Sequence, residues 1–359
     1  MSPEVDRHGQ TRTDPGRTAP IGSDGGRRPG RRGGRRRAGR GGERSMVPEA
    51  EFTSYYGRPV VKPSPWEHDI PAYLFAGGLA AGSSLLAAGA DLNDLPALRR
   101  VGRIGALGAL GFSMAALVHD LGRPSRFLNM LRTMKLTSPM SVGTWILSIY
   151  GPFAGAAAAG EVVGLLPEGK VKGPLRLLRL AGRPAGLLAG LTAPPVAAYT
   201  AVLLADTATP SWHSAYKELP FVFVSSGLAA AGGLAMIGTP TDQAGPARRA
   251  AAGGAVAELL AEQLMERSMG LTAEPLHKGH AGNLMKAAKA LTAAGAAGTL
   301  LSGRSRGIAM LSGAALMAGS ALTRFGVFEA GQESARDPKY TVVPQRERLD
   351  RGEPIRYQG

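Results

Sequence analysis

The sequence contains no cysteine. A chain without thiols cannot ligate an iron–sulfur cluster, form a disulfide or offer a thiol nucleophile. Aromatic residues are also scarce, at 6% of 359 residues, and the apolar content comes mainly from alanine, glycine and leucine. Small side chains let helices approach one another closely in lipid, so this composition favours a bundle of membrane helices.

Interior histidines are missing as well. The six histidines all fall in predicted tails, span ends or loops; they are His8, His68, His119, His213, His277 and His280. Bis-histidine haem needs ligands inside facing helices, which argues against a b-type cytochrome. The sequence also lacks a phosphate-binding loop, a dinucleotide-binding glycine motif, a zinc-ligand spacing and a nucleophile elbow.

Positive charge is abundant but unevenly placed. The net charge is +15, and residues 27–40 (RRPGRRGGRRRAGR) carry much of it without hydrophobic anchors. Such a run predicts a disordered, solvated tail over residues 1–65, with RNA or anionic-lipid binding as the alternative; no specific nucleic-acid partner is expected. No uncharged hydrophobic segment follows these arginines closely, so neither a secretory nor a twin-arginine signal is expected.

Long runs without Asp, Glu, Lys or Arg begin after this tail. A spanning helix needs about 20 mostly apolar residues, and four runs reach that length: 70–90, 136–160, 184–205 and 219–241. Two shorter runs, 104–118 and 307–323, are predicted to span if Arg103 and Arg324 extend toward the headgroups. A seventh segment, 281–303, tolerates Lys289 near its start.

The eighth candidate span, residues 249–269, carries three glutamates. Glu258, Glu262 and Glu266 are four residues apart and therefore share one helical face. The segment is either an interfacial amphipathic helix or a span whose carboxylates face the bundle interior as a proton path. The spanning interpretation keeps both termini on one side of the membrane.

The predicted fold class is therefore an all-α integral membrane protein: an eight-transmembrane-helix bundle over residues 66–325, with the disordered N-terminal tail before it and a polar C-terminal tail, 326–359, after it. The expected location is the cell membrane. Loops on the N-terminal side carry 8 Lys or Arg residues and the opposite loops 12. The basic tail favours an N-terminus on the cytoplasmic side, whereas the loops favour an N-terminus on the opposite side, so the orientation stays open.

Three polar clusters are candidates for function. The first is Trp66, Glu67, His68 and Asp69 at the entrance of the first predicted span. These residues suit interfacial anchoring, and Asp69 suits a helix N-cap. Tyr73 lies one turn inside, and Gly77 and Gly78 another turn on, which predicts a groove with room for a flat ring.

The second cluster, HDLGRPSRF (119–127), ends the second predicted span. His119 and Asp120 are predicted to pair, either as a solvated helix end or as a proton acceptor and donor, because histidine titrates near neutral pH. Arg123 lies in the following loop and is a candidate cofactor-binding residue. The third cluster is Tyr199, inside the fourth predicted span, with Asp206 at its far end. A buried tyrosine hydroxyl needs a partner, either a backbone carbonyl or a ligand.

These stretches carry a family likeness. The chain resembles the NrfD (polysulfide reductase membrane subunit) family in YYGRPVVKPSPWEHDIPAYLFAGGLAAGSSLLA (55–87), LVHDLGRPSRFLNMLRTMKLTSPMSVGTWILSIYG (117–151), YTAVLLADTATPSWHSAYKELPFVFVSSGLAAAGG (199–233) and RFGVFEAG (324–331). The resemblance implies eight transmembrane helices and a cofactor-free subunit that binds menaquinone or ubiquinone.

The resemblance also implies partners: a four-cluster ferredoxin-like iron–sulfur subunit, with which the chain exchanges electrons, and a molybdopterin catalytic subunit, polysulfide reductase-like or, from the wording of the C-terminal tail, formate dehydrogenase-like. Tyr199 is similar to the family's quinone-contacting tyrosine. Polar residues at the start of the first span also line the family's site, and the choice between His68 and Asp69 stays open.

A rival interpretation is a proton- or cation-coupled secondary transporter that uses Glu258, Glu262 and Glu266. Transporters often contain repeated halves, and no internal repeat is visible in this sequence. Whether the chain is itself an enzyme is left open by its residues.

Overall fold

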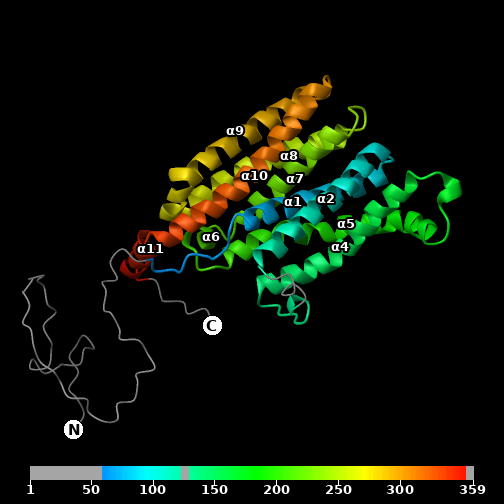
Figure 1. The fold of residues 1–359 in the computed structure, drawn as a ribbon. Helices are drawn as coiled ribbons and strands as arrows, with labels where there is room; N and C mark the ends of the chain where they lie inside the picture. The colour runs from blue at the N-terminus through cyan, green and yellow to red at the C-terminus, as the bar shows by residue number, and fades with distance from the viewer. Residues whose placement is uncertain (1–58, 123–128, 353–359) are drawn as a thin grey trace, which may run out of the picture. The chain divides into compact units, whose positions relative to one another are not determined.

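The computed structural model describes residues 59–122 and 129–352, all within one compact unit. In these residues every regular element is a helix. The long helices lie side by side (Figure 1). They are α1 (Asp69–Leu92), α2 (Pro96–Asp120), α4 (Pro139–Gly164), α5 (Pro174–Ala205), α7 (Leu219–Gly238), α8 (Gly245–Met269), α9 (Gly279–Leu301) and α10 (Arg306–Arg336).

Short elements connect or follow these helices. They are η1 (Glu168–Lys170), α6 (Pro210–Ser214), η2 (Gly270–Leu276) and α11 (Lys339–Asp350). We call the end of the bundle where α1 begins the Asp69 end, and the end where α1 turns into α2 the Arg99 end. Elements α6, η2 and α11 all lie at the Asp69 end (Figure 1).

The long helices form two rings of four. In the first bundle α1 contacts α2, α2 contacts α4, α4 contacts α5, and α5 contacts α1. In the second bundle α7, α8, α9 and α10 contact one another in the same cyclic order. The two bundles therefore share one cyclic order of helix contacts, which the sequence alone does not reveal.

The two bundles meet along α1 and α7. Between them Gly78 faces Gly227 so closely that a Cβ atom at position 227 would lie 3.0–3.2 Å from the backbone of Gly78. A Cβ atom at Gly82 would lie 2.8 Å from the carbonyl oxygen of Gly227. Glycines thus allow near-contact of the two backbones, which is how membrane helices gain packing energy in a solvent as apolar as their side chains.

Six helices have the length and composition of membrane spans: α1, α2, α4, α5, α7 and α10. They coincide with or largely cover the four long uncharged runs and the two shorter ones, so all six predicted segments are confirmed as helices of spanning length and composition. The spanning window of α1 is 83% buried and that of α2 only 39%, which makes α1 the central helix. Helices α8 and α9 are not among the six.

Two arginines occupy unexpected positions. Arg103 and Arg324 are buried, with exposures of 6% and 1%, so the prediction that they extend to the headgroups is wrong. Arg103 instead forms ion pairs of 3.0 Å with Asp91 and Glu161 from neighbouring helices. Acidic partners inside the bundle make burial of the guanidinium tolerable, and a run of uncharged residues in one helix cannot reveal them.

The last spanning helix extends past the suggested boundary at residue 325. Helix α10 continues to Arg336, and Phe328, Gln332 and Ser334 are buried along it. Tyr340 of α11 is buried too. The first part of the C-terminal region therefore packs on the Asp69 end, where it contacts α6 and η2.

Candidate functional site

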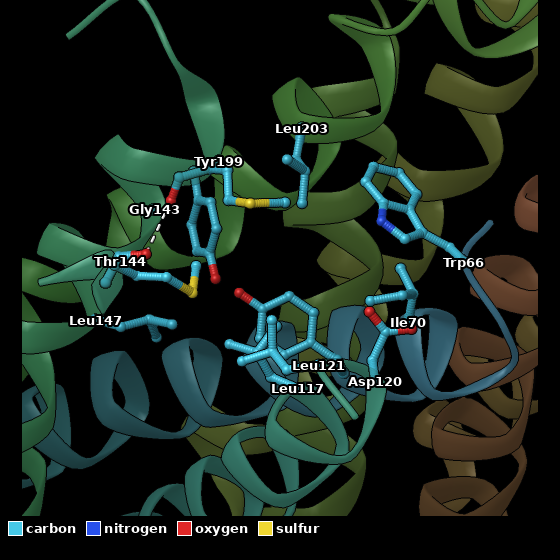
Figure 2. A pocket seen from close by; sticks show the side chains of 13 residues that line it. Trp66, Ile70, Leu117, Asp120, Leu121, Gly143, Thr144, Leu147, Tyr199 and Leu203 are labelled. Carbon is cyan, nitrogen blue, oxygen red and sulfur yellow. Dashed lines mark hydrogen bonds between the residues drawn. The ribbon is translucent and has the colours of Figure 1, made fainter. Parts of the chain in front are cut away.

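A pocket lies within the first bundle at its Asp69 end (Figure 2). Four helices, the segment before α1 and the chain between α2 and α4 form its wall, whose residues are Trp66, Ile70, Tyr73, Leu117, Asp120, Leu121, Met130, Met140, Gly143, Thr144, Leu147, Tyr199 and Leu203. Most of these side chains are apolar, and the polar ones are few. This combination is typical of small-molecule sites, where a few polar groups fix the orientation of a mostly apolar ligand.

Tyr199 extends from α5 into the pocket (Figure 2). Its ring packs on Gly143 of α4: a Cβ atom at position 143 would lie only 2.4 Å from Cε2 of Tyr199. The glycine therefore sets the position of the ring. Within the described residues the Tyr199 hydroxyl has no hydrogen-bond partner, although the side chain is only 8% exposed. An unpaired hydroxyl on a side chain that lines a pocket is available to a ligand.

Tyr73 of α1 also lines the pocket and is buried. The glycines that follow it do not form the predicted groove. Gly78 packs against Gly227 and Arg324, and Gly77 faces Ser113 at 3.7 Å from a Cβ atom. Neighbouring helices fill the space, so the expectation of room for a flat ring beside Gly77 and Gly78 is wrong; the residues of α1 that line the pocket are Ile70 and Tyr73.

Acidic and histidine side chains cluster at the rim. Nδ1 of His119 lies 2.7 Å from Oδ2 of Asp69, so His119 pairs with Asp69 and not with its neighbour Asp120. Asp69 is the first residue of α1 and does not act as an N-cap. Asp120 points into the pocket (Figure 2) and hydrogen-bonds with the backbone of Glu67. The rim thus combines the exposed His119 with the half-buried Asp120 at the end of α2.

His68 lies outside the pocket. Its Nε2 is 2.8 Å from Oε1 of Glu329 on α10, and its side chain is 74% exposed. The structure therefore separates the two residues that the sequence left as alternatives: Asp69 pairs with His119 at the rim, and His68 connects α1 to the second bundle.

The second bundle also positions a pocket wall. Trp66 stacks on Trp212 of α6 with ring centroids 6.0 Å apart. Nε1 of Trp212 donates to the carbonyl of Val327 at 2.8 Å. Nε2 of Gln332 donates to the carbonyl of Trp66 at 3.2 Å. Through these contacts α10 holds in place the segment before α1, which forms one wall of the pocket.

The pocket is narrow in this state. Its free volume is about 40 Å³, which is room for only a few water molecules. Two of its wall residues, Met130 and Met140, have flexible thioether side chains that adapt readily to a ligand. An aromatic headgroup would enter only as such side chains move.

The structure thus brings three predicted residues together around the pocket: Tyr73, Asp120 and Tyr199. Asp69 and His119 lie at its rim, and Arg123 lies outside the described residues. Sequence reasoning missed Met140, Gly143 and Thr144, which face the pocket from α4. The sequence pointed to them only in that they lie within residues 117–151, the second stretch that resembles the family. Within the described residues no group of three His, Asp or Glu side chains is arranged to hold a metal ion.

Comparison with known proteins gives one family. The model of the family described as polysulphide reductase, NrfD, matches residues 60–265, which is more than half of the chain. A search of curated proteins gives no match. The matched region begins just before α1 and ends within α8, so it contains the whole first bundle and its pocket. The chain therefore belongs to the polysulphide reductase NrfD family.

Proposed function

We propose that this protein is the quinone-reactive membrane anchor of a molybdopterin oxidoreductase complex, and that the pocket of the first bundle is its quinone site. Members of the family are membrane subunits of such complexes, and the apolar helices support a multi-pass membrane protein. The observation that carries the proposal is the pocket itself, which presents Tyr199, Tyr73 and Asp120 within an apolar wall.

We further propose that α8 and α9 span the membrane, which gives eight spans. Both helices run between the same two ends as α7 and α10. Their 25 and 23 residues correspond to about 37 and 34 Å at 1.5 Å per residue, enough for a hydrocarbon core of about 30 Å. Glu258 and Glu262 lower the hydropathy of α8, yet both are buried and avoid lipid.

A quinone accepts two electrons and two protons when it is reduced, so its site needs hydrogen-bond donors and a proton supply. The Tyr199 hydroxyl has the chemistry and the freedom to donate to a quinone carbonyl. The ring is oriented by its contact with Gly143, which fixes where the hydroxyl points. Hydrogen bonds from a preorganised donor stabilise the charge that develops on a carbonyl oxygen as it is reduced.

Protons would reach the pocket from its rim. The His119 side chain is 81% exposed and bonds to Asp69, and the next residue along α2, Asp120, faces the pocket. A histidine held by a carboxylate exchanges protons with water near neutral pH. His119 and Asp69 would therefore collect protons at the surface, and Asp120 would hold the proton that is transferred in the pocket.

Electrons would come from, or go to, a partner. Because the chain has no cysteine, we propose that an iron–sulfur subunit of the four-cluster ferredoxin-like type docks at the Asp69 end, where the pocket lies closest to the surface. The molybdopterin catalytic subunit, polysulfide reductase-like or formate dehydrogenase-like, would bind that subunit in turn. The quinone would be menaquinone or ubiquinone from the cell membrane.

Substitution of Tyr199 tests the proposal. Tyr199→Phe removes the hydroxyl and keeps the ring, so quinone-coupled turnover of the purified complex should fall by about 10- to 100-fold while the subunits still co-purify. Tyr216→Phe, at an exposed tyrosine beyond α6, is the matched control. Turnover of Tyr199→Phe equal to that of both Tyr216→Phe and the unchanged complex would show that the Tyr199 hydroxyl plays no part in quinone chemistry.

A further inference from the structure

The second bundle buries two carboxylates that do not line the pocket. Glu258 and Glu262 of α8 are each 1% exposed, and they face the interior of the ring formed by α7, α8, α9 and α10. Ionisable side chains at such depth are costly unless they are paired or used. Neither residue takes part in the chemistry of the first bundle, so their burial requires a separate explanation.

These carboxylates are only partly satisfied. Oε1 of Glu258 accepts from the Thr323 hydroxyl at 2.9 Å, but the Oε2 atoms of Glu258 and Glu262 have no hydrogen-bond partner in the described part of the chain. Buried polar atoms without protein partners are places where water enters or where a proton is held.

A buried cation lies beside them. Arg324 of α10 is 1% exposed, and Nη2 donates to the carbonyl of Phe223 at 2.6 Å. Its Nε and Nη1 atoms are unpaired within the described residues. The guanidinium interacts electrostatically with Glu258 and Glu262, yet it forms no direct ion pair with either of them in the described structure. The unpaired donors and the unpaired acceptors therefore belong to one buried group of electrostatically coupled side chains.

The buried pair connects to the surface along α8. Glu266 lies one turn from Glu262, and a turn rises only about 5–6 Å. Glu266 forms an ion pair with Lys289 of α9, and its Oε2 lies 3.7 Å from Nε2 of His277. His277 follows η2 and is 52% exposed. Titratable groups therefore follow one another from His277 at the Asp69 end, through Glu266 and Glu262, to Glu258.

We propose that Glu266, Glu262 and Glu258 form a proton-transfer chain from the Asp69 end into the second bundle, separate from the quinone pocket. A proton from water passes to Glu266, protonates Glu262 as Glu266 ionises again, and then protonates Glu258 as Glu262 ionises. The charged groups that face the chain are Lys289 from α9, Arg324 from α10 and His277 beyond η2, and α7 contributes the Ser226 hydroxyl.

The chemistry of the chain favours a proton over a metal cation. Two fixed positive charges, Arg324 and Lys289, act on Glu262. They repel an added metal cation but permit neutralisation of one carboxylate by a proton. Thr323 and Ser226 supply hydroxyls that orient a proton donor and acceptor.

Infrared spectroscopy of the purified full-length protein tests the proposal. Difference spectra between pH values should contain the carbonyl band of a protonated carboxylic acid that shifts in D₂O, and Glu258→Gln or Glu262→Gln should remove part of it. Glu266→Gln should slow deuterium exchange of the remaining band by on the order of 100-fold. Arg267→Gln, an exposed change next to it, is the matched control.

The outcomes separate clearly. A band that keeps its full intensity in both Glu258→Gln and Glu262→Gln, exchange that is equally fast in Glu266→Gln and Arg267→Gln, or a band that responds to sodium and not to pH would each overturn the chain. The glutamine replacements keep the size of the side chain, and thermal unfolding of each variant verifies that it is folded. None of these measurements depends on quinone binding.

Discussion

The ring of Tyr199 lies directly on Gly143, 2.4 Å from where a Cβ atom would be. Gly143→Ala must therefore push the ring aside. If Tyr199 orients the quinone, this change should lower quinone-coupled turnover by about 10- to 100-fold, because small misplacements of a catalytic group are expensive. Turnover of the reconstituted complex is the measurement.

Gly155→Ala is the control for that prediction. It lies on the same helix, α4, and a Cβ atom there meets nothing within 4 Å. Normal turnover in Gly143→Ala would mean that the position of the Tyr199 ring does not matter to the reaction.

A second glycine contact tests the buried ion cluster at the Arg99 end. A Cβ atom at Gly186 would lie 2.3 Å from Nη2 of Arg103, which pairs with Asp91 and Glu161. Gly186→Ala should displace the Arg103 guanidinium, and Glu161→Gln should remove one of the two negative charges that pair with it. Each should lower the free energy of unfolding by about 3 kcal/mol and thus the melting temperature in detergent. An unchanged melting temperature in both variants would show that the cluster does not contribute to stability.

How much of this arrangement the sequence reveals depends on what each signal measures. Runs without charge located six spanning helices, because the cost of charge in lipid acts on each helix separately. The same logic failed for Arg103 and Arg324, since their burial depends on groups from other helices. The pairing of His119 with Asp69, 50 residues away, was missed for the same reason.

The pocket was predicted only in part. The polar residues Tyr73, Asp120 and Tyr199 stood out against apolar spans, because a polar side chain there is rare. Met140, Gly143 and Thr144 did not, because residues of these types are common in membrane helices and only the rotation of α4 turns them toward Tyr199.

The contact between η2 and α11 should depend on pH. Glu274 bonds with Lys278 and with Nζ of Lys339, the latter at 2.9 Å, and these ammonium groups lower the pKa of the Glu274 carboxyl to about 2. A carboxyl group whose pKa is lowered in the folded state stabilises the fold at pH values above its ordinary pKa, which is near 4.5. This stabilisation is lost as the pH falls toward 2.

Acidification over that range, or Glu274→Gln at neutral pH, should therefore loosen α11 from η2. Hydrogen exchange of residues 339–350 measures this directly. Faster exchange in Glu274→Gln than in Glu333→Gln, a change on neighbouring α10, is the expected result; equal exchange would show that α11 is held by other contacts.

The central claim is that a quinone headgroup occupies the pocket beside Tyr199, and photolabelling tests it most directly. A photoreactive quinone analogue, activated on the purified complex in lipid, should label peptides from α4 and α5 that contain Met140 and Tyr199, and excess unlabelled quinone should suppress this labelling. Label confined to other helices or to another subunit, with the α4 and α5 peptides unmodified, would contradict the account.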